Sequence, residues 1–296
     1  MMLVTRRDIL AAAAAAALVA GCGNRNSSVI AGSKNFSEEL FLGELYAQVL
    51  EKHSVPVTRK LDLGSTQIAM DAMQRGQLDL YPEYTGTALL VVLKAPVAYD
   101  PAAVYETVKR EYQERYKMTW LQPSPFDDTQ ALASTQELAN HYGVRTLSEL
   151  SRIAPQLRLA VTPEFLNRPD GLRRLKAAYG GFAFKQIVQV DIGLRYQALL
   201  DRRADVTVAF STDGEILEYR LLVFTDDKHA FPPYQAAPVV RNETLSHFPE
   251  VRTTLDRVAP LLDNRTIQAV NLEIVGPKKR EPADVARDFI AQHGLG

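Results

Sequence analysis

The sequence is nearly without cysteine. Cys22 is the only one among 296 residues, so the chain forms no internal disulfide and is held together by packing. The five histidines are scattered and lack the spacing of zinc ligands. No nucleophile elbow, Walker-type phosphate loop or dinucleotide-binding glycine motif occurs. These absences argue against an enzyme and give no sign of a metal or a cofactor.

An excess of charge is also missing. The 34 Lys and Arg residues nearly balance 35 Asp and Glu residues, and no long basic run is interleaved with aromatic residues. This argues against nucleic acid as a partner. A hydrophobic content of 46% and a charged content of 23% are typical of a globular protein rather than a disordered or membrane-spanning one.

The N-terminus has the pattern of an export signal. Arg6 and Arg7 form a basic segment, and residues 9–20 form an apolar stretch that is short for a membrane span. Residues 5–10 also resemble a twin-arginine signal. The sequence Leu-Val-Ala-Gly-Cys at residues 18–22 resembles the bacterial lipobox, in which cleavage leaves a lipidated cysteine.

We therefore expect a signal peptide over residues 1–21 and a lipidated Cys22. Residues 22–28 then form a flexible tether, since they are rich in Gly, Asn and Ser. The mature protein is expected at the periplasmic face or cell surface, anchored in the membrane by lipid. An ordinary signal peptide with an incidental cysteine, or a short signal anchor, is the alternative.

Helix-like and strand-like segments alternate from Val29 onward, which predicts an α/β fold. Proline-marked passages at residues 122–126 and 231–234 divide the pattern. We expect one lobe from residues 29–121 and 230–296, and a second lobe from residues 122–229. The expected strands cover residues 28–32, 57–63, 78–81, 157–161, 186–190, 205–210, 221–224 and 237–240; the expected helices cover residues 37–53, 65–74, 101–117, 193–203, 248–262 and 282–293, with another from residue 163.

Four polar and aromatic segments follow predicted strands or crossings, where open α/β sheets bind their ligands. They read Gly-Ser-Lys-Asn-Phe-Ser-Glu from residue 32, Tyr-Pro-Glu-Tyr-Thr-Gly-Thr from residue 81, Ser-Thr-Asp-Gly from residue 211, and Asp-Asp-Lys…Phe-Pro-Pro-Tyr ending at residue 234. Together they resemble the glycine betaine/choline/carnitine-type (osmoprotectant) substrate-binding proteins of ABC importers. The resemblance covers about residues 29–295.

This resemblance implies a two-lobed periplasmic-binding-protein fold of type II that closes on a small cationic or zwitterionic solute. It implies a monomer without a cofactor, whose permease and ATPase are separate chains. A quaternary ammonium has no N–H to donate, so ring faces must hold it by cation–π contact. By motif, the ligand-binding positions are Tyr84, Gln130, Phe210 and Tyr234 for the aromatic cage, with Thr87 and Lys34 at the polar end.

Two positions depart from the family pattern. Gln130 stands where a tyrosine is usual, at the end of an Asp-Asp-Thr-Gln segment, and Phe210 replaces another tyrosine. A missing ring costs about 0.5–2 kcal/mol of cation attraction. Asp128 or Glu39 would restore attraction if either faces the cleft.

Structural roles remain open for the same residues. Phe210 shares strand parity with Val206 and Val208, which is typical of a core position. Asp213 precedes a glycine and suits a turn or helix cap. A changed cargo (another betaine such as ergothioneine, or an amino acid derivative) and a periplasmic enzyme are the alternative functions.

Overall fold

The computed structural model describes residues 28–167 and 170–296. The expected signal peptide, Cys22 and nearly all of the expected tether lie outside the described residues. Among the residues described, none of the helices combines the length and apolar character of a membrane span.

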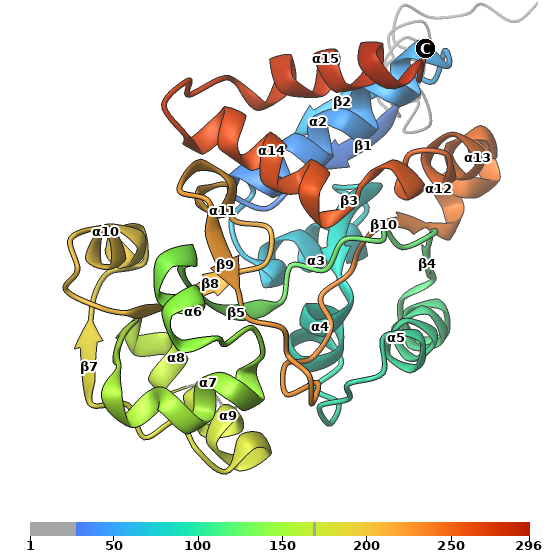
Figure 1. The fold of residues 1–296 in the computed structure, drawn as a ribbon. Coiled ribbons are helices and arrows are strands. Elements are labelled where there is room, and N and C mark those ends of the chain that lie inside the picture. Colours follow the sequence, from blue (N-terminus) through green and yellow to red (C-terminus); the bar gives the residue numbers. More distant parts are fainter. Residues whose placement is uncertain (1–27, 168–169) are drawn as a thin grey trace, which may run out of the picture.

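Two five-stranded mixed sheets, one in each lobe, form the framework (Figure 1). The first has the order β2-β1-β3-β10-β4, with β1 parallel to β2 and β3, and β10 antiparallel to β3 and β4. Its strands are β1 (Val29–Gly32), β2 (Val57–Lys60), β3 (Leu80–Tyr84), β4 (Met118–Trp120) and β10 (Ala236–Arg241).

The second sheet has the order β7-β6-β8-β5-β9, in which β6 runs parallel to β7 and β8 while β5 runs antiparallel to β8 and β9. Its strands are β5 (Gln130–Thr135), β6 (Arg158–Val161), β7 (Gln186–Gln189), β8 (Val206–Phe210) and β9 (Leu221–Val223). This is the two-lobed α/β architecture that the sequence predicts.

Helices cover both sheets. Those of the first lobe are α2 (Ser37–Lys52), α3 (Thr66–Gln74), α4 (Thr85–Thr87), α5 (Pro101–Tyr116), α12 (Asn242–His247), α13 (Glu250–Asp256), α14 (Asn264–Val275) and α15 (Pro282–His293). Those of the second are α6 (Gln136–Tyr142), α7 (Leu147–Ile153), α8 (Pro163–Asn167), α9 (Leu172–Tyr179), α10 (Arg195–Leu200) and α11 (Glu215–Glu218).

Local sequence explains where several helices begin. Asp100 accepts a hydrogen bond from the Ala103 N–H at 2.7 Å, and Pro101 occupies the first turn of α5, where its missing N–H costs nothing. The apolar stripe of α2 is buried, and its Phe41 meets Phe289 of α15 edge-on, with ring centroids 5.8 Å apart. Figure 1 shows α14 and α15 lying beside α2.

The chain crosses between the sheets at residues 121–129 and 224–235. The two crossings lie side by side, because Asp127 and Gln235 form an antiparallel bridge and Asp127 Oδ1 accepts the Tyr234 N–H at 2.6 Å. The lobes also touch where Asn271 of α14 donates to the Thr212 carbonyl at 2.9 Å. These contacts position the two halves of the cleft described below.

Several element boundaries differ from expectation. Strand β3 runs to Tyr84, so Pro82 and Glu83 lie within a strand rather than after it. Pro82 faces Pro238 in register. The neighbouring Thr85 N–H bonds the Gln235 carbonyl, so the facing prolines fall at a pair that exchanges no hydrogen bonds and tolerates the missing N–H. The helix expected at residues 248–262 is shorter, and α14 was not predicted.

Candidate functional site

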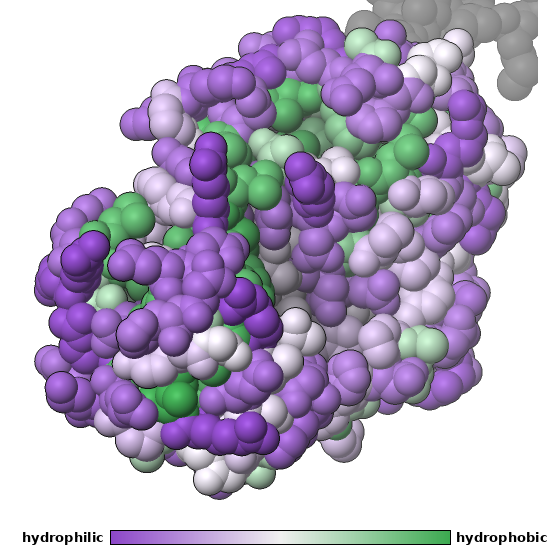
Figure 2. All heavy atoms as spheres, in the orientation of Figure 1, coloured by the Kyte–Doolittle hydropathy of each residue, from purple (hydrophilic) through white to green (hydrophobic). Residues whose placement is uncertain are grey.

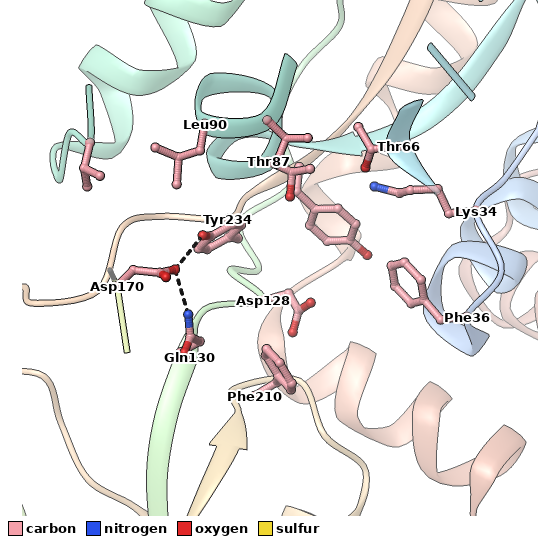
Figure 3. Close-up of a pocket in the computed structure, with 13 residues that line it drawn as sticks. Lys34, Phe36, Thr66, Thr87, Leu90, Asp128, Gln130, Asp170, Phe210 and Tyr234 are labelled. Carbon is pink, nitrogen blue, oxygen red and sulfur yellow. Dashed lines mark hydrogen bonds between the residues drawn. The ribbon is translucent and has the colours of Figure 1, made fainter. Parts of the chain in front are cut away.

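A cleft of about 630 Å³ lies between the lobes. Figure 2 shows the groove between the two lobes, with apolar side chains along part of its wall. The cleft is lined by Lys34, Phe36, Thr66, Tyr84, Thr87, Leu90, Val91, Val97, Asp128, Gln130, Asp170, Phe210 and Tyr234. The structure therefore brings all six predicted ligand-binding residues to one cavity (Figure 3).

Aromatic rings enter the cleft from both lobes. Tyr84 comes from the end of β3, Phe210 from the end of β8, and Tyr234 from the second crossing. Phe36, which the sequence analysis did not single out, stacks on Tyr84 with ring centroids 6.1 Å apart. Phe210 is only partly buried and lines the cleft, so its side chain is not a core position.

Lys34 is a buried cation with two carboxylate partners. Its Nζ lies 2.7 Å from Glu83 Oε1 and 3.3 Å from Glu39 Oε1. The same Nζ lies 4.7 Å from the Tyr84 ring centroid, within cation–π range. Burial lowers the pKa of Lys34, but the attraction of Glu39 and Glu83 outweighs it, so the pKa is raised overall.

Glu39 faces Lys34 rather than the cleft. Its other oxygen accepts the Lys34 backbone N–H at 3.0 Å, and the side chain is fully buried. Burial raises the pKa of Glu39 to about 8, although the charge of Lys34 opposes the rise. The carboxylate is thus committed to the lysine, and of the two acids considered in the sequence only Asp128 lines the cavity.

Two further carboxyl groups have neutral partners. The Tyr84 hydroxyl donates to Glu38 Oε1 at 2.5 Å, and Asn271 Nδ2 donates to Glu38 Oε2 at 2.9 Å. The Thr212 hydroxyl donates to Asp128 Oδ1 at 2.6 Å. Burial raises the pKa of both carboxyls, and the charge of Glu38 raises that of Asp128 further.

Gln130 belongs to a polar wall. Its Nε2 donates to Asp170 Oδ2 at 2.8 Å, and the Tyr234 hydroxyl donates to the same oxygen at 3.2 Å (Figure 3). Because a carboxylate only accepts, this contact turns the amide nitrogen toward Asp170. Asp170 was not predicted, since no motif marks it and it meets Gln130 from 40 residues away in the chain.

Asp213 has the structural role that its position before Gly214 suggests. Its Oδ2 accepts the Phe210 N–H at 2.7 Å, the Arg195 guanidinium at 2.6 Å and the Tyr196 hydroxyl at 2.6 Å. These three bonds fix the end of β8. Asp213 therefore holds the backbone that carries the Phe210 ring into the cleft.

Known proteins resemble this chain over nearly all of its length. The family model described as the substrate-binding domain of ABC-type glycine betaine transport systems matches residues 27–292. The chain belongs to this family. A glycine-betaine-binding protein of Pseudomonas aeruginosa is 39% identical over 274 residues, which cover 89% of this chain and 87% of that protein.

Two other relatives are informative. The ergothioneine transport permease/ergothioneine binding protein EgtU of Helicobacter pylori is 34% identical over 268 residues, or 90% of this chain and 48% of that protein. A crystal structure described as a glycine betaine/carnitine/choline ABC transporter superposes with a TM-score of 0.87 at 32% identity, covering 90% of this chain and 99% of the other. The family model and the Pseudomonas aeruginosa relative identify the chain as a substrate-binding protein of a betaine- or carnitine-type ABC transporter.

Proposed function

We propose that this chain captures a quaternary-ammonium solute (glycine betaine, choline, carnitine or a similar molecule) in the cleft between its lobes and presents it to an ABC permease. The observation that carries the proposal is the character of the described lining. Aromatic rings come from both lobes, the carboxyl groups of Asp128 and Asp170 line the same cleft, and Lys34 is paired with buried carboxylates.

The proposed roles follow from chemistry. Tyr84, Phe210 and Tyr234 offer ring faces to methyl groups that carry the positive charge, since a quaternary ammonium can donate no N–H bond. Thr87 and Lys34 take the polar end of the ligand. The rings belong to different lobes, so the cage is complete only when the lobes close.

The carboxylate of Asp128 compensates for the aromatic ring that is missing because Gln130 stands where the family usually has a tyrosine. In Figure 3 its carboxyl lies beside Phe210 and faces the part of the cleft where Phe36 enters. A carboxylate here attracts a cation without needing a hydrogen bond from it. The amide at Gln130 then changes which ligand the aromatic cage of this family prefers.

Calorimetric titration tests this proposal. Choline, glycine betaine, carnitine and ergothioneine are compared with ethanolamine, which lacks the methyl groups, and with 3,3-dimethylbutanol, which lacks the charge. We expect a methylated cation to bind far better than either control. Failure of every methylated amine to bind at millimolar concentration would refute the proposal.

A double variant locates the site. Tyr84→Ala with Tyr234→Ala should abolish binding while the protein still unfolds cooperatively on heating. The matched control is Tyr142→Ala, because Tyr142 is an exposed tyrosine outside the cleft. Retained affinity in the double variant would place the ligand elsewhere.

Ergothioneine is a second candidate, and the polar wall favours it. This betaine carries an imidazole-derived ring, whose polar atoms can bond a wall built from Gln130, Asp170 and Tyr234 where the usual cage has another ring. The similarity to the Helicobacter pylori ergothioneine-binding protein supports it. If ergothioneine binds more tightly than choline and glycine betaine in the titration, this second candidate is favoured.

We also propose that Cys22 carries a lipid and that residues 22–28 tether the binding lobes to the membrane. The lipobox-like segment supports this. A lipid anchor keeps a receptor beside its permease and ATPase, which are separate chains in this proposal.

A further inference from the structure

Two carboxyl groups beside the aromatic rings have no cation of their own. Within residues 28–167 and 170–296, no Lys or Arg forms an ion pair with Glu38 or Asp128, and both side chains have neutral donors as partners. Lys34, the cation in the cleft lining, is committed to Glu39 and Glu83. Among the described residues, the pair therefore has no basic side chain to balance its charge.

The two carboxyls lie near the rings of the cleft. Glu38 accepts the Tyr84 hydroxyl, and Asp128 lines the main cleft together with Tyr84 and Phe210. Glu38 and Asp128 also line one adjoining cavity of about 410 Å³, with Asn271 and Thr212 between them in the hydrogen-bond chain. A cation held against the rings thus lies close to both acids.

Apart from Glu38 and Asp128, the charged groups that line the adjoining cavity are Arg195, Asp213 and Glu215. Asp213 follows β8 and is paired with Arg195, while Asp127 lies on the first crossing beside Asp128. Burial is the main cause that raises the pKa of Glu38 and of Asp128, and repulsion from Asp213 adds to it for both. Two neighbouring buried acids ionise together only at high cost, which favours one proton shared between them.

We propose that a bound cation takes the place of a proton that Glu38 and Asp128 hold in the empty cleft, so that ligand binding releases a proton and tightens as the pH rises. The inference rests on the proposed binding of a cation. It adds a property that a cage of rings alone does not have, because cation–π attraction to rings does not depend on a side-chain proton.

Calorimetry with choline measures the released proton directly. Choline has no group that titrates near neutral pH, so a proton that appears comes from the protein. The titration is run at pH 7 in phosphate and in Tris, whose ionisation enthalpies differ. We expect the observed enthalpy to depend on the buffer with a slope of about one proton, and the affinity to approach about a tenfold rise per pH unit while the pair is protonated.

Substitutions identify the source of the proton. Asp128→Asn keeps an oxygen for the Thr212 hydroxyl and should bind choline with no buffer dependence and a flat pH profile. Glu38→Gln carries the same expectation and serves if the first variant does not fold. Asp201→Asn, which changes an exposed carboxylate outside the cleft, should keep the slope of the unmodified protein.

The outcomes separate this inference from the proposed function. Choline binding with equal enthalpy in both buffers overturns the inference and leaves the cation site standing. An unchanged slope in both Asp128→Asn and Glu38→Gln also overturns it, because the proton then comes from another group such as Glu39. Failure of all methylated ammonium compounds to bind overturns both.

Discussion

Gly86 sets the position of one wall of the cleft. It lies in α4 and packs against the second crossing, where a Cβ added to it would lie 2.6 Å from the Pro233 carbonyl oxygen and 2.7 Å from Tyr234 Cε1. Carbon atoms pack at about 3.5–4.0 Å, so neither approach is possible without movement. Only glycine permits the observed distance between α4 and the Tyr234 ring.

Gly86→Ala should therefore displace Tyr234. The crossing is tied by the bond between Asp127 and the Tyr234 N–H, so part of the strain remains in the folded protein. Overpacking of this kind costs about 1–3 kcal/mol of stability. Loss of the ring face costs a bound cation about 0.5–2 kcal/mol, which weakens binding by about 2- to 30-fold.

The assay combines thermal unfolding with calorimetric titration of the tightest methylated ligand. Gly86→Ala should melt at a lower temperature and bind more weakly. Gly193→Ala is the control, because a Cβ at Gly193 meets no atom within 4 Å. If Gly86→Ala melts and binds like the unmodified protein, the close packing of Gly86 does not set the position of the Tyr234 ring.

Three other changes test other parts of the structure. Lys34→Met should cost about 3–5 kcal/mol in urea unfolding, because it leaves Glu83 buried without its cation; a loss below 1 kcal/mol would contradict this. Burial raises the pKa of Glu39 to about 8, so the folded protein favours the protonated side chain. The contribution of this group to the free energy of unfolding is therefore largest at acid pH and is lost as the pH rises through about 8. The urea midpoint of the ligand-free protein should fall as the pH rises toward about 8, and it should fall less in Glu39→Gln. If the midpoint has the same pH dependence in both proteins, Glu39 is not the cause. Cys22→Ser should move the protein from the membrane to the soluble fraction, and its retention would refute the lipid anchor.

The sequence predicts the fold and six of the thirteen residues that line the cleft for a physical reason. The motif blocks follow strands, and strand ends of an open α/β sheet meet at one edge, so Lys34 and Tyr84 were expected to lie together. The two proline-marked passages correspond to the crossings between the sheets. The motif blocks and the proline-marked passages are both local sequence patterns, and each indicates where its segment lies in the folded protein.

Other features depend on contacts that no local pattern reports. Glu38 and Glu39 look like first-turn carboxylates that favour the helix N-terminus. The structure buries both: Lys34, five residues earlier, pairs with Glu39, and the Tyr84 hydroxyl reaches Glu38 from 46 residues away. Asp170 likewise gains its place from Gln130 and Tyr234, which lie 40 and 64 residues away in the chain.

The proposed site has one ring fewer, at Gln130, and one carboxyl group, that of Asp128, in the lining. This difference changes more than the affinity for a cation. A ring contributes about 0.5–2 kcal/mol to holding a cation. A full charge about 4 Å away contributes about 4 kcal/mol at the effective dielectric constant of a partly buried site. Asp128 can therefore outweigh the ring missing at Gln130, but only while it is ionised. The proposed cleft thus replaces an attraction that is constant with pH by a stronger one that depends on it, so its affinity for a cation should follow the titration of Asp128 and Glu38.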